Sequence, residues 1–143
     1  MQRLILMRHA KTEPWTEGVD DHARALTPVG HEAAAAMAVA LQTEGWAPER
    51  AVVSTARRTR ETWVHLSAVF ESCEMILEED LYLAGERGVS DLIADHDGAR
   101  TLIIISHNPG LHDLSLSILR AAGSRDHQAA IRIASKLPTG AAV

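Results

Sequence analysis

Apolar runs alternate with amphipathic stretches along this chain, and their order predicts the fold. Four short apolar runs are typical of buried strands; they cover residues 4–7, 51–53, 75–77 and 102–105. Apolar residues at helical spacing follow each run, over residues 28–45, 58–70, 86–95 and 111–119, with a weaker stretch at 125–133. This alternation predicts an α/β fold with three layers and a mainly parallel central sheet, forming a single domain over residues 1–143.

Two segments depart from this simple alternation. The polar segment 10–27 is too long for an ordinary connection, and loops of this length in compact domains are usually functional or disordered. It carries Asp20, Asp21, His22 and Arg24. Residues 138–143 resemble the beginning of a further strand. No remaining segment is long enough to form a large cap over the sheet.

Composition and charge restrict the classes of protein that need to be considered. The 143 residues are 46% hydrophobic and 23% charged, as in an ordinary globular protein. No run approaches the roughly 20 apolar residues of a membrane span, and the first apolar run is too short for a signal peptide. We therefore expect a cytoplasmic monomer. The net charge of −5 argues against general nucleic-acid binding, and the single Cys73 excludes an internal disulfide.

Chemically active side chains gather where the predicted strands end. Arg8 and His9 follow the first strand, and His107 follows the strand at 102–105. Arg58 falls in the first turn of the helix after the strand at 51–53, and Thr55 or Ser54 is expected to cap that helix. Ligands of open α/β sheets bind at the carboxyl ends of the strands, so these four residues are expected to share one pocket. Two guanidinium groups and two imidazoles suit a phosphate dianion, and a neutral imidazole is a competent nucleophile toward phosphorus.

The same residues are also compatible with other interpretations, which the sequence disfavours. A single histidine after a strand is more often structural than catalytic, and Arg8 alone could be a surface charge. A metal site is disfavoured because arginines repel a divalent cation and cannot ligate it, so no metal or other cofactor is expected. No Gly-x-Ser-x-Gly elbow accompanies Ser106-His107, which argues against a serine hydrolase. The remaining histidines of predicted helices and turns belong to no partner motif and are expected to face solvent: His31, His65, His96 and His127.

Four motifs, in order, resemble the histidine phosphatase superfamily, in particular its short, SixA-like branch. The first motif, at residues 6–12, is similar to the Arg-His-Gly signature of that superfamily. The second, at 24–30, is similar to an Arg-Pro-Leu-Thr-x-x-Gly segment. The third, at 54–62, matches a Ser-x-x-x-Arg-x-x-x-Thr pattern, in which Arg58 and not Arg57 keeps the four-residue spacing. The fourth, at 106–110, matches the segment around the second histidine.

The resemblance implies a phosphoglycerate-mutase-like fold and a metal-independent phosphatase. His9 would be the nucleophile that forms a phosphohistidine intermediate, and Arg8, Arg58 and His107 would complete the catalytic pocket. His9 must be neutral to attack, and the nearby arginines should lower its pKa. Substrate-binding roles would fall to three further residues: Lys11, Arg24 and Asn108.

Two departures from the family pattern bear on the mechanism and the substrate. Ala10 replaces the usual glycine, as is common in the short branch, so a positive φ is not expected there. Leu83 occupies the place where larger members carry a proton-donating carboxylate, so the general acid is unassigned; Glu79 and Glu86 flank it out of register. The imidazole of a phosphoramidate is a better leaving group than the alkoxide of a phosphate ester. This favours phosphohistidine on a protein partner, such as a histidine phosphotransfer domain.

Three alternatives stay open: a small-molecule phosphomonoesterase of the same superfamily, a phosphomutase and a non-catalytic phosphate- or phosphoprotein-binding module. The short chain without a cap argues against the mutase. The presence of His9 argues against a module that only binds.

Overall fold

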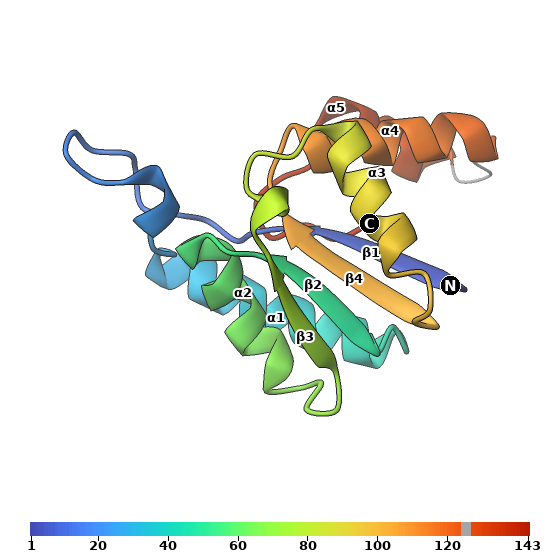
Figure 1. Ribbon diagram of the computed structural model, residues 1–143, viewed down its shortest axis with the longest axis horizontal. Helices are drawn as coiled ribbons and strands as arrows, with labels where there is room; N and C mark the ends of the chain where they lie inside the picture. The colour runs from blue at the N-terminus through green and yellow to red at the C-terminus, as the bar shows by residue number, and fades with distance from the viewer. Residues whose placement is uncertain (124–126) are drawn as a thin grey trace.

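Four parallel strands form the sheet of the computed structural model, which describes residues 1–123 and 127–143. Their order in the sheet is β1-β4-β2-β3. The strands are β1 (Arg3–Arg8), β2 (Arg50–Ser54), β3 (Glu74–Glu78) and β4 (Thr101–Ser106). Arg8 lies opposite Ser106, and Ser54 lies opposite Glu78. The register therefore brings all four carboxyl ends to one edge of the sheet (Figure 1).

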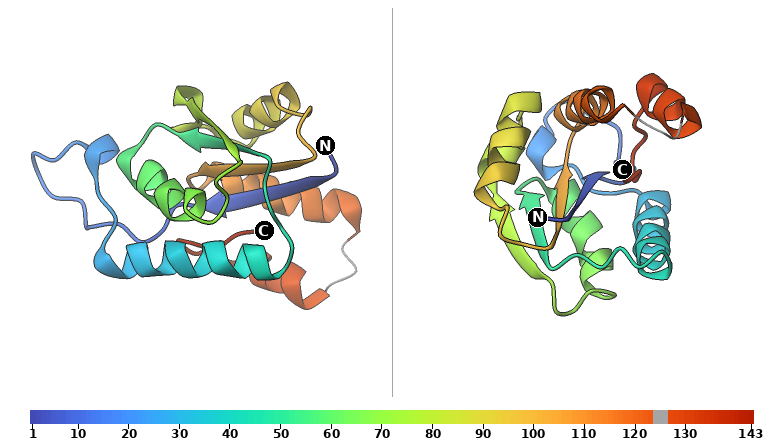
Figure 2. Two further views of the ribbon diagram at one scale, coloured as in Figure 1. Left: turned by 90° about the horizontal axis from the view of Figure 1, so that it is seen from below. Right: turned by 90° about the vertical axis from the view of Figure 1, so that its right-hand side faces the viewer.

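Helices cover both faces of the sheet, which confirms the predicted three-layer α/β fold. On one face lie α1 (Pro28–Thr43) and α2 (Arg57–Ser67). On the other lie α3 (Glu86–Asp95) and α4 (Gly110–Ala122), and α5 (His127–Ser135) packs against α4 (Figure 2). No cap domain interrupts the described chain.

The central position of β4 explains its uninterrupted apolar sequence. Alternate residues of β4 point to opposite faces, and both faces are covered. Ile103 and Ile105 join the core under α1 and α2, where Trp63 packs. Leu102 and Ile104 join the core on the α3 and α4 side. All four side chains are fully buried, and this packing fixes the position of the strand end that precedes His107.

Some local expectations differ from the structure. Ser54 or Thr55 was expected to cap α2, but this helix has Ala56 as its N-cap and no side-chain cap hydrogen bond. The prediction was wrong because both hydroxyls bond histidines instead. The expected strand at 138–143 is reduced to one antiparallel bridge between Ala142 and Met7. Of the helix expected at 125–133, residues 125 and 126 lie outside the described part.

The long segment between β1 and α1 extends from the carboxyl edge of the sheet, where Figure 1 draws it in blue. It contains a short 3-10 helix, η1 (Asp21–Ala23), and an antiparallel bridge joins Thr12 to Leu26 at its base. Thr27 caps α1 by accepting a hydrogen bond from the N–H of Gly30, as its sequence predicts. None of the helices in the described residues has the length and apolarity to cross a bilayer.

Candidate active site

His9 occupies the turn that leaves β1, and its side chain is held in one tautomer. Its Nδ1 lies 2.8 Å from the carbonyl oxygen of Ala10. A carbonyl only accepts hydrogen bonds, so Nδ1 carries the proton in the neutral ring. Nε2 therefore keeps its lone pair, and the imidazole is prepared for nucleophilic attack through that atom. Only 7% of the residue is exposed.

The turn around His9 is fastened to α2. The N–H of Ala10 donates to Thr62 Oγ1 over 3.1 Å, and that hydroxyl donates to the carbonyl of Arg58 over 2.7 Å. On the other side, the N–H of His9 donates to the carbonyl of Ser106 over 3.1 Å. Every described residue with a positive φ is a glycine, so Ala10 adopts an ordinary conformation, as expected.

His107 lies beside His9, with 5.2 Å between the ring centroids. Its Nδ1 accepts a hydrogen bond from Arg58 Nε over 3.3 Å. Its Nε2 therefore carries the proton and donates a hydrogen bond to Ser54 Oγ over 2.8 Å. The carboxyl ends of β1, β2 and β4 and the start of α2 thus converge on one cluster, as the strand pattern predicts.

Arg58 is buried and makes hydrogen bonds at both ends of its guanidinium group. Besides the bond from Nε to His107, Nη1 donates to the Asp21 carbonyl over 2.7 Å. Nη2 donates to the Asp21 carboxylate over 3.2 Å. The guanidinium also lies over the ring of Tyr82, 5.7 Å from its centroid. Three of its five N–H groups are thus engaged, which leaves two for a bound oxyanion.

Arg8 supplies the second guanidinium. Its Nη1 donates to the Leu137 carbonyl over 3.1 Å, and Asn108 Nδ2 donates to the same oxygen over 3.0 Å. Arg8 Nε is buried and has no hydrogen-bond partner among the described residues. Burial and the nearby Arg58 lower the pKa of Arg8 below its ordinary value. The pocket therefore contains closely spaced positive charges that an oxyanion would stabilise.

Both histidines are neutral at neutral pH. Burial, with smaller contributions from Arg58 and Arg8, lowers the pKa of His9 to about 4, although its bond to Ala10 acts in the opposite direction. Burial and Arg58 lower the pKa of His107 to about 3. The sequence led us to expect a lowered pKa for His9 because of the arginines. The lowering of the His9 pKa is confirmed, but burial contributes more to it than the arginines do.

The predicted substrate-binding residues have mixed positions. Arg24 reaches toward the pocket wall, where Nη1 donates to Asp21 and Nη2 donates to Thr12 Oγ1. The Lys11 side chain is exposed. Asn108 follows His107 and bonds the 137 carbonyl as described. Their contacts with substrate stay predictions.

Asp21 and Tyr82 belong to the site but were not singled out from the sequence. The Tyr82 hydroxyl donates to the Asp21 carboxylate over 2.7 Å, and the Tyr82 ring packs edge-on against His107. Hydrogen bonds from Arg24 and Tyr82, with the charge of Arg58, hold the pKa of Asp21 well below its usual range. Asp21 is therefore ionised. The only available signal was its place in the long loop, three residues before Arg24.

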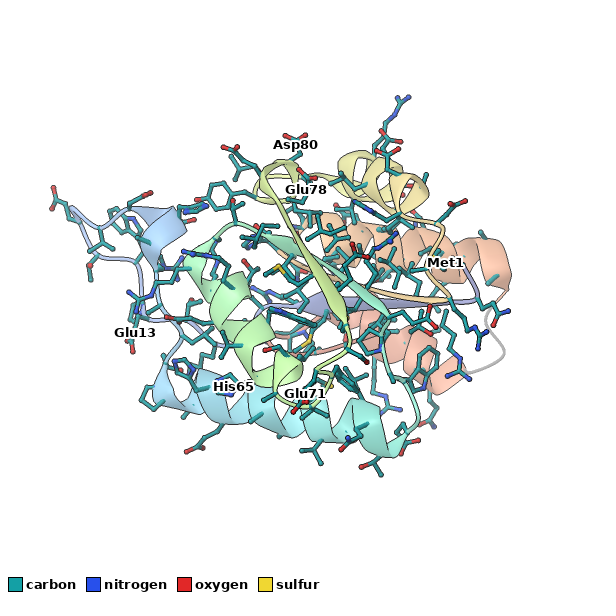
Figure 3. All side chains as sticks on the ribbon, turned by 60° about the horizontal axis from the view of Figure 1, so that its bottom comes forward. Met1, Glu13, His65, Glu71, Glu78 and Asp80 are labelled. Carbon is teal, nitrogen blue, oxygen red and sulfur yellow. The ribbon has the colours of Figure 1, made fainter. Side chains whose placement is uncertain are left out.

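Carboxylates elsewhere at this end of the molecule are poorly placed to donate a proton. Glu79 and Glu86, the residues that flank the expected position, are exposed. Leu83, which occupies that position, is 86% exposed. Figure 3 labels the neighbouring Glu78 and Asp80 at the outer side of β3 and η2 (Glu79–Leu81). The general acid therefore stays unassigned.

Two histidines outside the pocket correct an expectation. His31 Nδ1 and His65 Nε2 lie 2.9 Å apart between α1 and α2, so they are hydrogen-bonded partners and only partly exposed. Figure 3 labels His65 on the α1 side of α2. No cluster of three or more metal-binding side chains occurs in the part of the chain that the structure describes. The side chain of His127 lies outside that part.

Comparisons with known proteins agree with this geometry. The model of the histidine phosphatase superfamily, branch 1, matches residues 4–82. An uncharacterized protein of Mycobacterium leprae is 33% identical over 137 residues, which cover 93% of this chain and 82% of the relative.

Two solved structures with the provisional name phosphohistidine phosphatase SixA are also similar. The structure from Agrobacterium tumefaciens has a TM-score of 0.86 and 25% identity, covering 99% of this chain and 88% of the other. The structure from Nakamurella multipartitia has a TM-score of 0.79 and 27% identity, covering 99% and 81%. The chain belongs to the histidine phosphatase superfamily. It is a phosphatase of that superfamily, close in structure to these SixA proteins, and the predicted phosphoglycerate-mutase-like fold is confirmed.

Proposed function

We propose that this protein is a metal-independent phosphatase that removes the phosphoryl group from a phosphohistidine side chain of a partner protein. The partner is a phosphorylated domain such as a histidine phosphotransfer domain. One observation carries the proposal: the buried neutral His9 presents a lone pair on Nε2 beside Arg58 and His107. The names of the similar SixA structures support the same substrate class.

The reaction proceeds in two displacements at phosphorus. In the first, His9 Nε2 attacks, a new N–P bond forms, and the P–N bond to the leaving imidazole breaks. That bonding pair stays on the leaving nitrogen, which takes a proton from water and leaves a hydroxide ion. In the second, a water molecule attacks the phosphohistidine on His9 and gives a proton to that hydroxide. The N–P bond breaks with its electron pair returning to Nε2, and inorganic phosphate leaves with neutral His9 restored.

Arg8 and Arg58 stabilise the charge of the transferred group. Phosphoryl transfer spreads negative charge over three equatorial oxygens, and fixed cations aimed at them stabilise the transition state. Arg58 is already fixed before substrate binds, because Asp21 and His107 hold its guanidinium. Little reorganisation is then needed during the reaction.

The absence of a neutral carboxylic acid within the described pocket favours a phosphoramidate substrate. Asp21 is ionised, and its carboxylate accepts hydrogen bonds from three side chains. An alkoxide leaving group needs a proton donor, and general acid assistance is worth about 10²–10⁴-fold in rate. An imidazole that is protonated, or that takes a proton from water, leaves without a general acid from the enzyme. His107 stays available as a donor once a bound phosphate dianion raises its pKa.

The test compares substrates under one set of conditions, in the presence of a chelator. We expect kcat/KM for a phosphohistidine-bearing phosphotransfer domain to exceed that for sugar phosphates by roughly 10²-fold or more. His9→Ala should abolish turnover of both. Preference for the sugar phosphates would favour the small-molecule phosphomonoesterase instead. Tight phosphate binding without turnover in the native protein would favour a binding module.

A further inference from the structure

Asp21 connects three segments around the pocket through its carboxylate. Oδ1 accepts a hydrogen bond from Arg24 over 2.8 Å. Oδ2 accepts one from Arg58 over 3.2 Å and one from the Tyr82 hydroxyl over 2.7 Å. These donors come from the loop after β1, from α2 and from the residue after η2. One side chain in a surface loop therefore joins elements that are far apart in the sequence.

The contacts determine how Arg58 is presented to a ligand. The guanidinium is held at Nε by His107 and at both terminal nitrogens by Asp21, through its carbonyl and its carboxylate. A long arginine side chain held at both ends loses little freedom when an oxyanion binds. A substitution of Asp21 keeps the backbone carbonyl that accepts from Nη1, but it removes the charged carboxylate that holds Nη2.

Asp21 also changes the charge of the pocket. Arg8, Arg24 and Arg58 carry three positive charges, and His9 and His107 are neutral. The carboxylate of Asp21 offsets one of these charges, so a net charge of two meets a phosphate dianion. A pocket with greater excess charge would bind inorganic phosphate and the transition state more tightly by similar amounts. Such uniform binding gives no gain in turnover and delays the release of product.

We propose that Asp21 is a positioning residue that holds Arg58 ready for phosphoryl transfer and weakens the hold of the pocket on the phosphate product. The proposal rests on the phosphoryl-transfer part of the proposed function and not on the nature of the leaving group. A role in folding the loop alone would predict something different, because a disordered loop would weaken phosphate binding and turnover together.

The experiment compares Asp21→Asn with Asp20→Asn, an identical change of charge one residue away. Asp20 is exposed and accepts a hydrogen bond from the N–H of His22, a contact that asparagine can also make. Two quantities are measured: kcat for p-nitrophenyl phosphate and the inhibition constant of inorganic phosphate. For Asp21→Asn we expect kcat to fall tenfold or more, while phosphate inhibits as strongly as before or up to about tenfold more strongly. Asp20→Asn should stay within twofold in both.

Two results would overturn the proposal. A parallel loss of kcat and phosphate affinity would make Asp21 a support for loop folding only. A kcat within threefold of the native value would remove any positioning role. If Asp21→Asn does not fold, Asp21→Glu carries the test. Its retained charge should keep phosphate inhibition within about twofold, while its longer side chain lowers kcat at least threefold; an unchanged kcat would again refute the proposal.

These readouts are independent of the natural substrate. A protein that hydrolyses p-nitrophenyl phosphate but ignores phosphohistidine would contradict the proposed function and leave the Asp21 comparison intact. If the native protein hydrolyses neither, calorimetric titration with inorganic phosphate replaces inhibition. Weaker binding in Asp21→Asn than in Asp20→Asn would then overturn the charge-offset part of the proposal.

Discussion

His107 donates a hydrogen bond from Nε2 to Ser54 Oγ over 2.8 Å, across the adjacent ends of β4 and β2. Ser54 is fully buried and His107 nearly so. Arg58 Nε can only donate to Nδ1 and so sets the tautomer of His107, while the bond to Ser54 holds the ring in the orientation that Arg58 meets. A serine at the end of a strand therefore controls the orientation of an imidazole in the proposed phosphate pocket.

Ser54→Ala should reduce both stability and turnover. The His107 N–H would lose its acceptor in a buried position, which costs about 1–3 kcal/mol in the free energy of unfolding. A displaced imidazole should lower kcat roughly tenfold, since a misplacement of about 1 Å can cost up to 10²-fold. Chemical denaturation and steady-state kinetics measure the two effects. Ser54→Thr keeps a hydroxyl and serves as control. Equal activity of the alanine variant and the native protein would contradict the inferred role.

Neighbouring arginines on α2 should differ sharply in their effects. Arg58→Ala should lower turnover of p-nitrophenyl phosphate by roughly 10²–10³, as for the loss of an oxyanion-hole donor. Arg57 is the matched control because its side chain is 52% exposed and pairs with Glu61 over 2.7 Å. Arg57→Ala should stay within about threefold of the native rate. Similar losses in both variants would show that the pocket is assigned to the wrong residues.

Titration of the histidines should reveal two strongly depressed pKa values. Burial lowers the pKa of His9 to about 4 and that of His107 to about 3. The ring resonances of both should therefore show no transition near pH 6.5 in proton NMR spectra of the ligand-free protein. His9 stays neutral and nucleophilic in mildly acidic solution, and attack fails only as pH falls through about 4. His9→Gln assigns the resonance, and a midpoint above 6 would contradict the inferred environment.

Acid should destabilise the protein before the carboxylates titrate. In the unfolded chain both histidines bind protons near pH 6.5, whereas the folded protein keeps them neutral to about 4 and 3. The stability that comes from keeping both histidines neutral is complete above pH 6.5 and is lost as the pH falls toward these lower values. Each histidine contributes a slope of up to roughly 1.4 kcal/mol per pH unit. Denaturant melts between pH 7 and 4 measure this slope, which His107→Gln should reduce.

The fold could be predicted from the apolar pattern because each strand and helix is marked by its own local sequence. Residues 102–105 are apolar without interruption since both faces of β4 are covered by helices. The same logic placed His9 and His107 at the carboxyl ends of parallel strands, and Arg58 in the first turn of the helix after the strand at 51–53. That β1 and β4 are neighbours was not predicted. These positions depend on strand ends, which sequence periodicity marks well.

The rest of the site depends on contacts between distant segments. Nothing in the local sequence distinguishes Asp21 from Asp20, yet only Asp21 accepts hydrogen bonds from Arg58 and Tyr82 in the described structure. The N-cap of α2 was predicted wrongly for a related reason: Ser54 and Thr55 are good caps in isolation, but their hydroxyls bond histidines from other segments.

The loop after β1 is tied firmly at its base and left free at its tip. The bridge between Thr12 and Leu26 and the bonds from Arg24 to Thr12 and to the carbonyl of Glu13 close its two arms together. Beyond this closure, Trp15 is 61% exposed. Substitutions and insertions at residues 14–19 should therefore leave the phosphate chemistry untouched. The sequence of this exposed tip can therefore vary without changing the contacts that hold the pocket together.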